Sequence, residues 1–185
     1  MDFYAHTQGK DKKDWQKLKD HLTAVADMAR AALASIRAQA EVRNIGTELL
    51  LPATALRIRA DRTRLLQILI NLLSNAVKFT PNNGRIILRV AETSAGEVEF
   101  SVADTGIGMT VAEIEVALEP FGQVDTTLSR SFGGTGLGLP LALKLTELHG
   151  GRLEMTSIKG EGTTVKVTLR AARVVARDGV RVGGI

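Results

Sequence analysis

The sequence predicts an α+β fold: a two-layer sandwich in which one mixed, mostly antiparallel sheet is covered on one face by three main helices. The strands are expected in two hairpins separated by helical segments, which disfavours a doubly wound parallel sheet. Only 4% of the residues are aromatic, so the core must be mainly aliphatic, which suits helices packed on a sheet. A chain of 185 residues is long enough for one domain with tails.

The N-terminal part of the chain is predicted to contain two helices and a short strand. Residues 1–19 are polar and mixed in charge, and are interpreted as a linker, the remnant of a helix or sequence introduced by cloning. Residues 20–43 carry apolar residues at helical spacing and predict the first helix, with which the domain begins. Residues 56–59 alternate like a strand, and Asp61 then offers an N-cap to a second helix that runs to about Phe79.

Two hairpins are predicted in the rest of the chain. The first joins residues 85–91 to residues 97–103, where apolar residues alternate along the second strand. The second joins residues 152–158 to residues 164–170 through a turn rich in glycine. Both hairpins are expected to lie in the same antiparallel sheet.

The segment between the hairpins contains a long loop and a third long helix. Residues 110–134 show little periodicity apart from the short helical stretch VAEIEVALE, and loops of this length are often lids or binding loops. The third helix follows a cluster of glycines and ends at Gly150. The domain is therefore expected to span residues 20–172, followed by a flexible tail at 173–185.

Composition excludes several classes of protein. The chain has no cysteine, so it has no disulfide framework and no thiolate metal site, and a cytoplasmic location is expected. No apolar run approaches the roughly 20 residues of a membrane-spanning helix, so no membrane contact is expected from this chain, although its parent protein can be membrane-anchored. The net charge of +4 is scattered and few aromatic residues accompany it, which disfavours binding to nucleic acid.

The second helix carries one polar stripe on an otherwise apolar surface: Gln67, Asn71, Ser74, Asn75 and Lys78. A solvent-facing edge is the simplest interpretation, but such an edge normally carries Glu, Lys or Arg. Asparagine disfavours a helix by roughly 0.5 kcal/mol relative to alanine, so two asparagines one turn apart indicate a polar cavity. Amide oxygens there can coordinate a hard cation such as Mg²⁺, and Lys78 can reach a phosphate.

Asp104 follows the second strand of the first hairpin and precedes Gly106 and Gly108. One interpretation is a turn that ends the strand. The other is a carboxylate that accepts a hydrogen bond from an amino group, with glycines that let a flat ring approach the backbone. Adenine has such an amino group where guanine has a carbonyl, so Asp104 would select ATP.

The glycine cluster before the third helix comprises Gly133, Gly134, Gly136 and Gly138. Without Cβ atoms, successive N–H groups can close around phosphate oxygens at a helix N-terminus, where the helix dipole also favours anions. A flexible hinge is the alternative. The motif GxxxxGK[ST] is absent and no strand precedes the glycines, so the chain has neither a P-loop nor a dinucleotide-binding βαβ unit.

Four short motifs follow one another in the chain. They are N-x-x-x-N-A-x-K-F at 71–79, D-x-G-x-G at 104–108, P-F-G-Q at 120–123 and G-T-G-L-G-L at 134–139. This series resembles the N, G1, F and G2 boxes of the catalytic and ATP-binding domain of bacterial sensor histidine kinases, which belongs to the GHKL superfamily and has the Bergerat fold. The resemblance covers residues 22–169.

The resemblance implies a site for ATP and Mg²⁺. Asn75 would be a Mg²⁺ ligand, Asn71 and Lys78 would contact the phosphates and serve catalysis, and Asp104 would bind the adenine amine with support from Thr163. The other positions implied at the nucleotide are Gly106, Ile107, Gly108, Met109, Phe121, Arg130, Gly134, Thr135, Gly136, Leu137, Gly138 and Leu139. Phe121 would anchor a mobile lid at 109–133. Arg130 would contact a phosphate, with a solvated charge on the lid as the alternative.

The resemblance also implies the reaction. Related ATPases of this fold, such as gyrase, mismatch-repair ATPases and large heat-shock chaperones, have a glutamate as general base where this chain has Asn71. An amide cannot take a proton from water, so transfer of the γ-phosphoryl group to a protein histidine is favoured over hydrolysis. The acceptor motif H-E-L-R-T-P is absent, and none of His6, His21 and His149 is expected to replace it.

The expected partners follow from the missing acceptor. The chain would act on a dimerisation and phosphoacceptor domain of its own parent protein, and indirectly on a response regulator. Alone it is expected to be a monomer that does not autophosphorylate. Two alternatives stay open: a nucleotide-binding pseudokinase that acts through partner docking, and a serine kinase of the anti-sigma-factor type, which shares the pocket.

Overall fold

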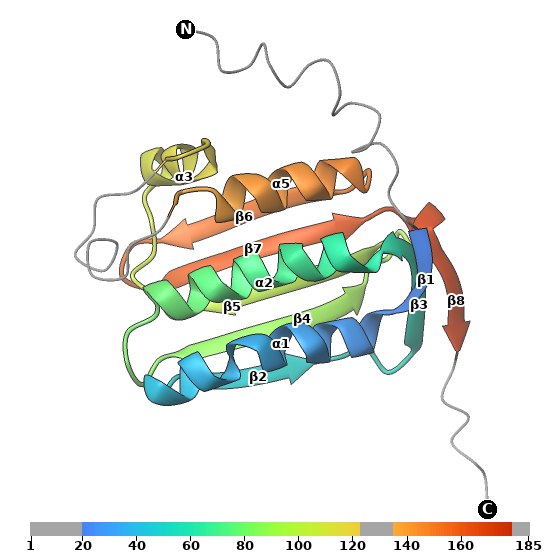
Figure 1. Cartoon of the computed structure of the whole chain (residues 1–185), viewed down its shortest axis with the longest axis horizontal. Coiled ribbons are helices and arrows are strands. Elements are labelled where there is room, and N and C mark those ends of the chain that lie inside the picture. Colours follow the sequence, from blue (N-terminus) through green and yellow to red (C-terminus); the bar gives the residue numbers. More distant parts are fainter. Residues whose placement is uncertain (1–19, 123–134, 179–185) are drawn as a thin grey trace, which may run out of the picture.

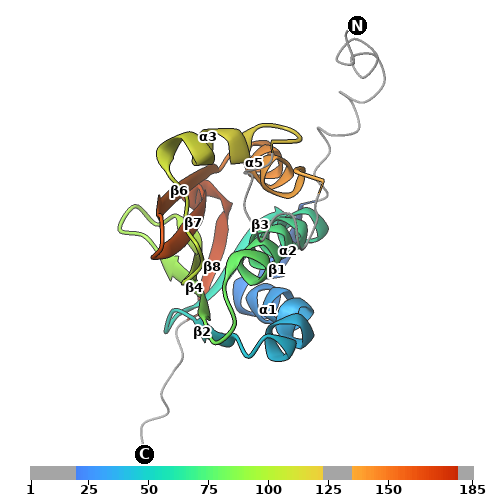
Figure 2. The same cartoon turned by 90° about the vertical axis from the view of Figure 1, so that its left-hand side faces the viewer.

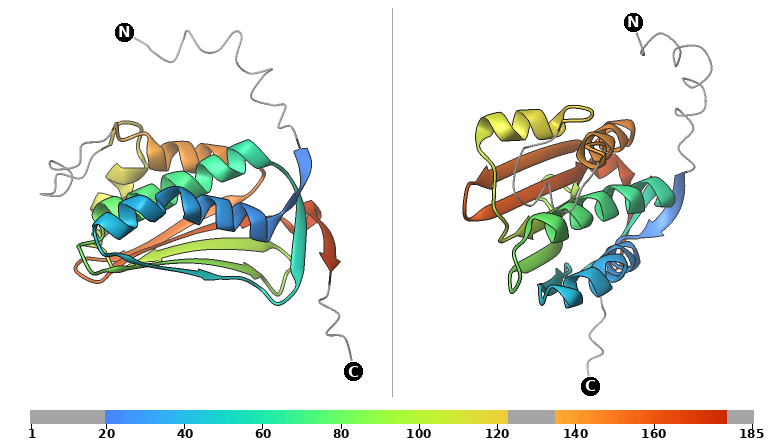
Figure 3. Two further views of the ribbon diagram at one scale, coloured as in Figure 1. Left: turned by 60° about the horizontal axis from the view of Figure 1, so that its bottom comes forward. Right: turned by 60° about the vertical axis from the view of Figure 1, so that its left-hand side comes forward.

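The computed structural model describes residues 20–122 and 135–178. Three long helices, α1 (Val25–Val42), α2 (Arg62–Phe79) and α5 (Gly138–Leu148), lie side by side on one face of a five-stranded sheet (Figure 1). Turned views show the helical layer on one side and the strands on the other (Figures 2 and 3). The predicted two-layer α+β sandwich with three main helices is therefore confirmed.

The five-stranded sheet is mixed and mostly antiparallel. Its order is β2-β4-β5-β7-β6, and only the pair formed by β2 and β4 is parallel. The strands in that order are β2 (Gly46–Leu50), β4 (Arg85–Glu92), β5 (Val98–Asp104), β7 (Gly162–Leu169) and β6 (Arg152–Ile158). Both predicted hairpins are confirmed. Strand β2 is not predicted from the sequence, because this short edge strand lacks the alternation of apolar and polar residues that marks a strand.

A second sheet has the order β1-β3-β8 and lies at one end of the sandwich (Figure 1). Its strands are β1 (Asp20–Ala24), β3 (Ala55–Asp61) and β8 (Val174–Asp178). The central strand β3 contains the strand that the sequence predicts at 56–59, with Leu56, Ile58 and Ala60 buried.

Two predicted boundaries are wrong because both flanking segments pair with β3. The first helix does not begin at residue 20, since residues 20–24 form β1, in which Asp20 pairs with Asp61. The predicted flexible tail at 173–185 does not begin at 173, because residues 174–178 form β8 and Arg173 closes a 3-10 helix, η1 (Ala171–Arg173). Periodicity within each segment could not reveal these pairings, which depend on a distant strand.

The core lies between the helices and the large sheet and is mainly aliphatic, as predicted. In the described part of the chain, helix α2 contributes the most buried residues from one element, and Phe100 on β5 is the largest fully buried side chain. The buried residues of α2 are Leu65, Ile68, Leu69, Leu72, Leu73, Ala76 and Val77. The short helix α3 (Val111–Leu118) buries no residue and begins with a capping box formed by Thr110 and Glu113. No helix in the described part of the chain has the length and apolar character needed to cross a membrane.

The predicted N-cap of α2 is confirmed, since the backbone N–H of Arg64 donates to the Asp61 carboxylate at 3.1 Å. Replacing Asp61 with alanine should lower the free energy of unfolding by about 1 kcal/mol, because an N–H group of the first turn loses its partner. Urea denaturation measures this change. Glu154→Ala is the control: this exposed carboxylate on β6 forms a surface ion pair with Arg152, and its loss should cost less than about 0.5 kcal/mol. Equal losses in both variants would contradict the assignment of the cap.

Candidate functional site

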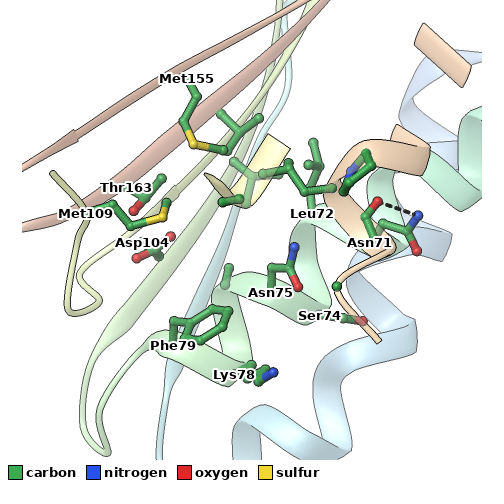
Figure 4. A pocket seen from close by; sticks show the side chains of 18 of the residues that line it. Asn71, Leu72, Ser74, Asn75, Lys78, Phe79, Asp104, Met109, Met155 and Thr163 are labelled. Carbon is green, nitrogen blue, oxygen red and sulfur yellow. Dashed lines mark hydrogen bonds between the residues drawn. The ribbon is translucent and has the colours of Figure 1, made fainter. Parts of the chain in front are cut away.

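A cavity of about 330 Å³ lies between α2, the start of α5 and strands β5, β6 and β7 (Figure 4). This volume lies in the range of small-molecule sites. Twelve of the residues predicted at the nucleotide line it: Asn71, Asn75, Lys78, Asp104, Ile107, Gly108, Met109, Thr135, Gly136, Gly138, Leu139 and Thr163. The structure therefore brings together the helix stripe, the aspartate at the strand end and the glycines before α5.

The remaining predicted positions do not line the cavity or are not described. Gly106 does not line the cavity but donates its backbone N–H to Asp104, and Phe121 and Leu137 are 72% and 38% exposed. The backbone N–H of Phe121 donates to the carbonyl of Gly136 at 3.1 Å, so Phe121 still joins the end of the α3 segment to the start of α5. Arg130 and Gly134 lie outside the described residues.

Asp104 supplies a half-buried hydrogen-bond acceptor at one end of the cavity. Its Oδ1 accepts the backbone N–H of Gly106 at 2.8 Å, and Asp104 pairs with Thr163 in the sheet. Burial raises the pKa of Asp104 to about 6, although the backbone N–H groups of Gly106 and Thr163 favour the carboxylate. A Cβ atom at Gly106 would lie 2.5 Å from Asp104 Oδ1, so glycine is needed for this contact.

Ser157 on β6 connects the segments of the neighbouring wall and is not among the residues predicted from the sequence. Its Oγ accepts the backbone N–H of Met109 at 2.7 Å and donates to the carbonyl of Gly162 at 2.9 Å. The same oxygen lies 2.8 Å from Oγ1 of Thr163. The available signal was the register of the second hairpin, which places Ser157 opposite Thr163. Ser157 thus joins two cavity residues, Met109 and Thr163, without lining the cavity itself.

The polar stripe of α2 forms the other side of the cavity, where Figure 4 shows Asn71, Asn75 and Lys78 in a row. Both polar atoms of the Asn71 amide form hydrogen bonds. Its Nδ2 donates to the carbonyl of Gly138 at 3.0 Å, and its Oδ1 accepts from Nε2 of Gln67 at 2.9 Å. A Cβ atom on Gly138 would lie 3.9 Å from both amide atoms of Asn75. The amide of Asn75 is therefore next to the first residue of α5.

Lys78 places a cation at the C-terminal end of this stripe. Its Nζ lies 4.9 Å from the centroid of the Phe79 ring, and burial lowers the pKa of Lys78 from its ordinary value. Partial burial of an ammonium group costs hydration free energy, and an anion bound beside the group offsets part of that cost. Lys78 is thus suited to meet a phosphate within the cavity.

Helix α5 begins at the cavity, and its N-cap residue, Leu137, makes no capping hydrogen bond through its side chain. Its first residues, Gly138, Leu139 and Pro140, line the cavity, and Gly136 just before it has a φ of 67°. A left-handed backbone of this kind favours glycine. An uncapped helix N-terminus presents N–H groups and the positive end of the helix dipole, which together favour an anion such as phosphate.

His149 does not have the setting of a phosphoryl acceptor. It is 1% exposed at the far end of α5, and its Nδ1 lies 2.8 Å from the carbonyl of Leu145. A buried ring that contacts its own helix cannot reach a phosphate in the cavity. His21 lies in β1, and His6 lies outside the described residues.

The arrangement of charges and apolar walls suits one kind of ligand. The acceptor at one end can receive a hydrogen bond from a donor such as an amine, and apolar side chains that include Leu72, Met109 and Met155 leave space for a flat ring. Two amides, a lysine and a helix N-terminus lie at the other end. This combination fits an amine-bearing base joined to phosphates.

Comparison with known proteins agrees with this geometry. Residues 60–173 match the family described as histidine kinase-, DNA gyrase B-, and HSP90-like ATPase. The matched segment contains every residue that has been placed at the cavity.

Two curated relatives are histidine kinases. The circadian input-output histidine kinase CikA of Synechococcus elongatus is 50% identical over 109 residues, which cover 59% of this chain and 14% of CikA. The histidine protein kinase DivJ of Caulobacter vibrioides is 38% identical over 143 residues, which cover 77% of this chain and 24% of DivJ. The chain therefore spans less than a quarter of the length of either relative.

Two solved structures have the same fold. Full-length ShkA in complex with AMPPNP superposes with a TM-score of 0.77 at 28% identity, over 89% of this chain and 33% of ShkA. The nucleotide-free catalytic domain of the histidine kinase ThkA superposes with a TM-score of 0.70 at 27% identity, over 82% of this chain and 96% of that domain.

Proposed function

Because the chain belongs to the family of histidine kinase-, DNA gyrase B- and HSP90-like ATPases, we propose that it is the ATP-binding catalytic domain of a two-component sensor histidine kinase. It binds ATP with Mg²⁺ and transfers the γ-phosphoryl group to a histidine on a separate dimerisation and phosphoacceptor domain of its parent protein. From that histidine the phosphoryl group passes to a response regulator. The proposed site of action is the cytoplasm.

The observation that carries the choice of reaction is the amide of Asn71, in a cavity whose described lining offers no base near it. Among the described residues that line the cavity, Asp104 is the only carboxylate, and it is held at the end assigned to the adenine. Activation of water needs a group that accepts a proton near the γ-phosphate, and Asn71 cannot do this. A neutral imidazole attacks with its own lone pair, whereas a serine hydroxyl must also lose a proton. The cavity therefore favours a histidine acceptor over both water and serine.

The residues present fit ATP and Mg²⁺. The described residues contain no cluster of three or more His, Cys, Asp or Glu side chains that could hold a metal by themselves. Mg²⁺ is often bound by one or two protein oxygens together with substrate phosphates, and the amide oxygen of Asn75 next to the start of α5 suits that role. The ion would neutralise charge on the phosphates. Lys78, Asn71 and the first turn of α5 would hold the same phosphates in place.

Phosphoryl transfer between separate domains tests this proposal. The chain is mixed with the phosphoacceptor domain of its parent and with ATP labelled at the γ-phosphate. Label is expected on a histidine of the acceptor domain, with the acid lability and base stability of phosphohistidine, and none on the chain alone. Binding of ATP without any label on the acceptor would indicate a pseudokinase. Label on serine would indicate a serine kinase.

The affinity for adenosine should fall about 10-fold between pH 7 and pH 5, because the carboxylate form of Asp104 would then be depleted. The pKa of Asp104 is about 6 in the folded protein, so the group is mostly ionised at pH 7 and mostly protonated at pH 5. Adenosine is the suitable ligand because it has no phosphate that titrates in this range. Calorimetry at several pH values measures the change. A constant affinity between pH 5 and pH 7 would contradict the role of the carboxylate.

A further inference from the structure

The C-terminal end of α2 needs partners for its last carbonyl groups. The last bond of the helical type runs from the backbone N–H of Thr80 to the carbonyl of Ala76 at 3.0 Å. The carbonyls that follow receive no hydrogen bond from an N–H group of the helix. They belong to Val77, Lys78, Phe79 and Thr80. Buried carbonyls of this kind require donors from elsewhere in the fold.

One side chain, that of Arg43, donates hydrogen bonds to three of these four carbonyls. Arg43 lies just after α1 and is half-buried. Its Nη1 donates to the carbonyls of Val77 and Lys78, the latter at 3.2 Å, and its Nη2 donates to the carbonyl of Thr80 at 2.7 Å. A guanidinium group at a helix C-terminus also interacts favourably with the helix dipole.

The fourth carbonyl connects the same helix end to the adenine side of the cavity. The carbonyl of Phe79 accepts the backbone N–H of Ile107 at 3.1 Å, and the carbonyl of Ile107 accepts the N–H of Gly160 at 2.8 Å. Lys78, Phe79 and Ile107 line the cavity, whereas Arg43 does not. The end of α2 therefore joins Lys78, on the phosphate side, to the segment that follows Asp104.

We propose that Arg43 is a positioning residue for nucleotide binding, which holds the last turn of α2 and thereby sets the places of Lys78 and Ile107 in the cavity. This inference rests on the proposed binding of ATP at this site. Arg43 acts through the backbone and does not touch the nucleotide.

Loss of the guanidinium leaves three carbonyls of the last turn without their donor, so this turn loosens. Lys78 and the loop at Ile107 then lose their fixed positions, and small displacements of binding groups have large effects. Arg43→Met keeps an apolar stem of similar length and removes the donors. It is expected to weaken the binding of Mg-ATP about 10-fold. Arg43→Lys, which keeps one cation, should weaken it less.

Arg173 provides a matched control. Its Nε donates to the carbonyl of His149 at the end of α5, at 2.5 Å, and its Nη1 donates to the carbonyl of Arg59 at 2.8 Å. Like Arg43 it is a half-buried arginine that binds backbone carbonyls at a helix end, but that end is not part of the cavity. Arg173→Met should lower thermal stability as Arg43→Met does, while its affinity for Mg-ATP stays unchanged.

The test measures the Kd for Mg-ATP by calorimetry on the full 185-residue chain, at a temperature where each variant is folded. A larger Kd in Arg43→Met together with an unchanged Kd in Arg173→Met supports the inference. An unchanged Kd in Arg43→Met, or equal losses in both variants, overturns it. If Arg43→Met does not fold, a wild-type Kd in Arg43→Lys overturns it instead. If the unsubstituted chain does not bind ATP, the proposed function fails and the inference fails with it.

Hydrogen exchange in the ligand-free protein gives a second, local readout. The amide of Ile107 donates to Phe79, so its protection reports on the contact between α2 and the loop. The protection factor of this amide should fall at least 5-fold more in Arg43→Met than in Arg173→Met. A 5-fold fall corresponds to a loss of about 1 kcal/mol in the free energy of local opening. Equal protection of the Ile107 amide in the two variants would overturn the inference.

Discussion

Asp104→Asn is expected to weaken the binding of ATP by about 100-fold, which corresponds to the loss of a hydrogen bond to a charged group together with an unpaired donor. The carboxylate accepts the N–H groups of Gly106 and Thr163 and has a further lone pair for the ligand amine. An asparagine has one acceptor oxygen in place of two, so its NH₂ group must face either a backbone N–H or the amine of the adenine. Each of these contacts places a donor against a donor.

The same substitution should leave the folded state about as stable at pH 7. The pKa of Asp104 is raised to about 6, so the folded state binds the proton more tightly than the unfolded state does. This group therefore favours folding more as the pH falls through 6, and its ionisation at pH 7 opposes folding. Removal of the charge offsets the loss of one backbone hydrogen bond.

Calorimetry with ATP measures the effect of Asp104→Asn, and Glu99→Gln serves as the matched control. Glu99 is on the same strand, forms an ion pair with Lys166 and does not line the cavity. The affinity of the Glu99→Gln variant for ATP should equal that of the unsubstituted chain. Wild-type affinity in Asp104→Asn would show that the adenine amine is not recognised by this carboxylate.

Asn75→Ala should reduce phosphoryl transfer to the acceptor domain by more than about 100-fold, because the only amide proposed to bind Mg²⁺ is removed. The unsubstituted chain should bind ATP more tightly with Mg²⁺ than in the presence of a chelator. In the variant the two affinities should be alike. Alanine is a better helix former than asparagine, so α2 itself is not expected to lose stability.

Gln39→Ala is the control for Asn75→Ala. Gln39 is an exposed amide on α1, away from the cavity, and its replacement should change neither the transfer rate nor the dependence on Mg²⁺. A variant Asn75→Ala that keeps its dependence on Mg²⁺ would remove Asn75 as a metal ligand and leave the rest of the site in place.

Much of the candidate site could be predicted because its residues follow local patterns. The spacing of Asn71, Asn75 and Lys78 places them on one face of a helix wherever that helix packs. Asp104 ends an alternating strand, and the glycines before α5 precede a helix with apolar periodicity. Each of these signals is contained in fewer than about 18 consecutive residues, the window over which periodicity is informative.

The contacts that support the site could not be predicted in the same way. Arg43 and Ser157 are ordinary residues in their local sequences, and neither belongs to a motif. Arg43 meets carbonyls 34 to 37 positions away, and Ser157 meets Met109 at a distance of 48 positions. Such hydrogen bonds depend on how the elements pack, and no property of one segment reveals them.

The sequence by itself determined the types of the long elements, the N-cap at Asp61 and twelve of the residues that line the cavity, because helix and strand periodicity and capping are local properties of the chain. Only the tertiary structure decided that residues 20–24 and 174–178 are strands, since both depend on the hydrogen-bonding edges of β3. Tertiary packing also decided how α2 ends, because the donors for its last carbonyls come from Arg43 and Ile107. A strand needs a neighbour and a helix end needs external partners, and folding supplies both from distant parts of the chain.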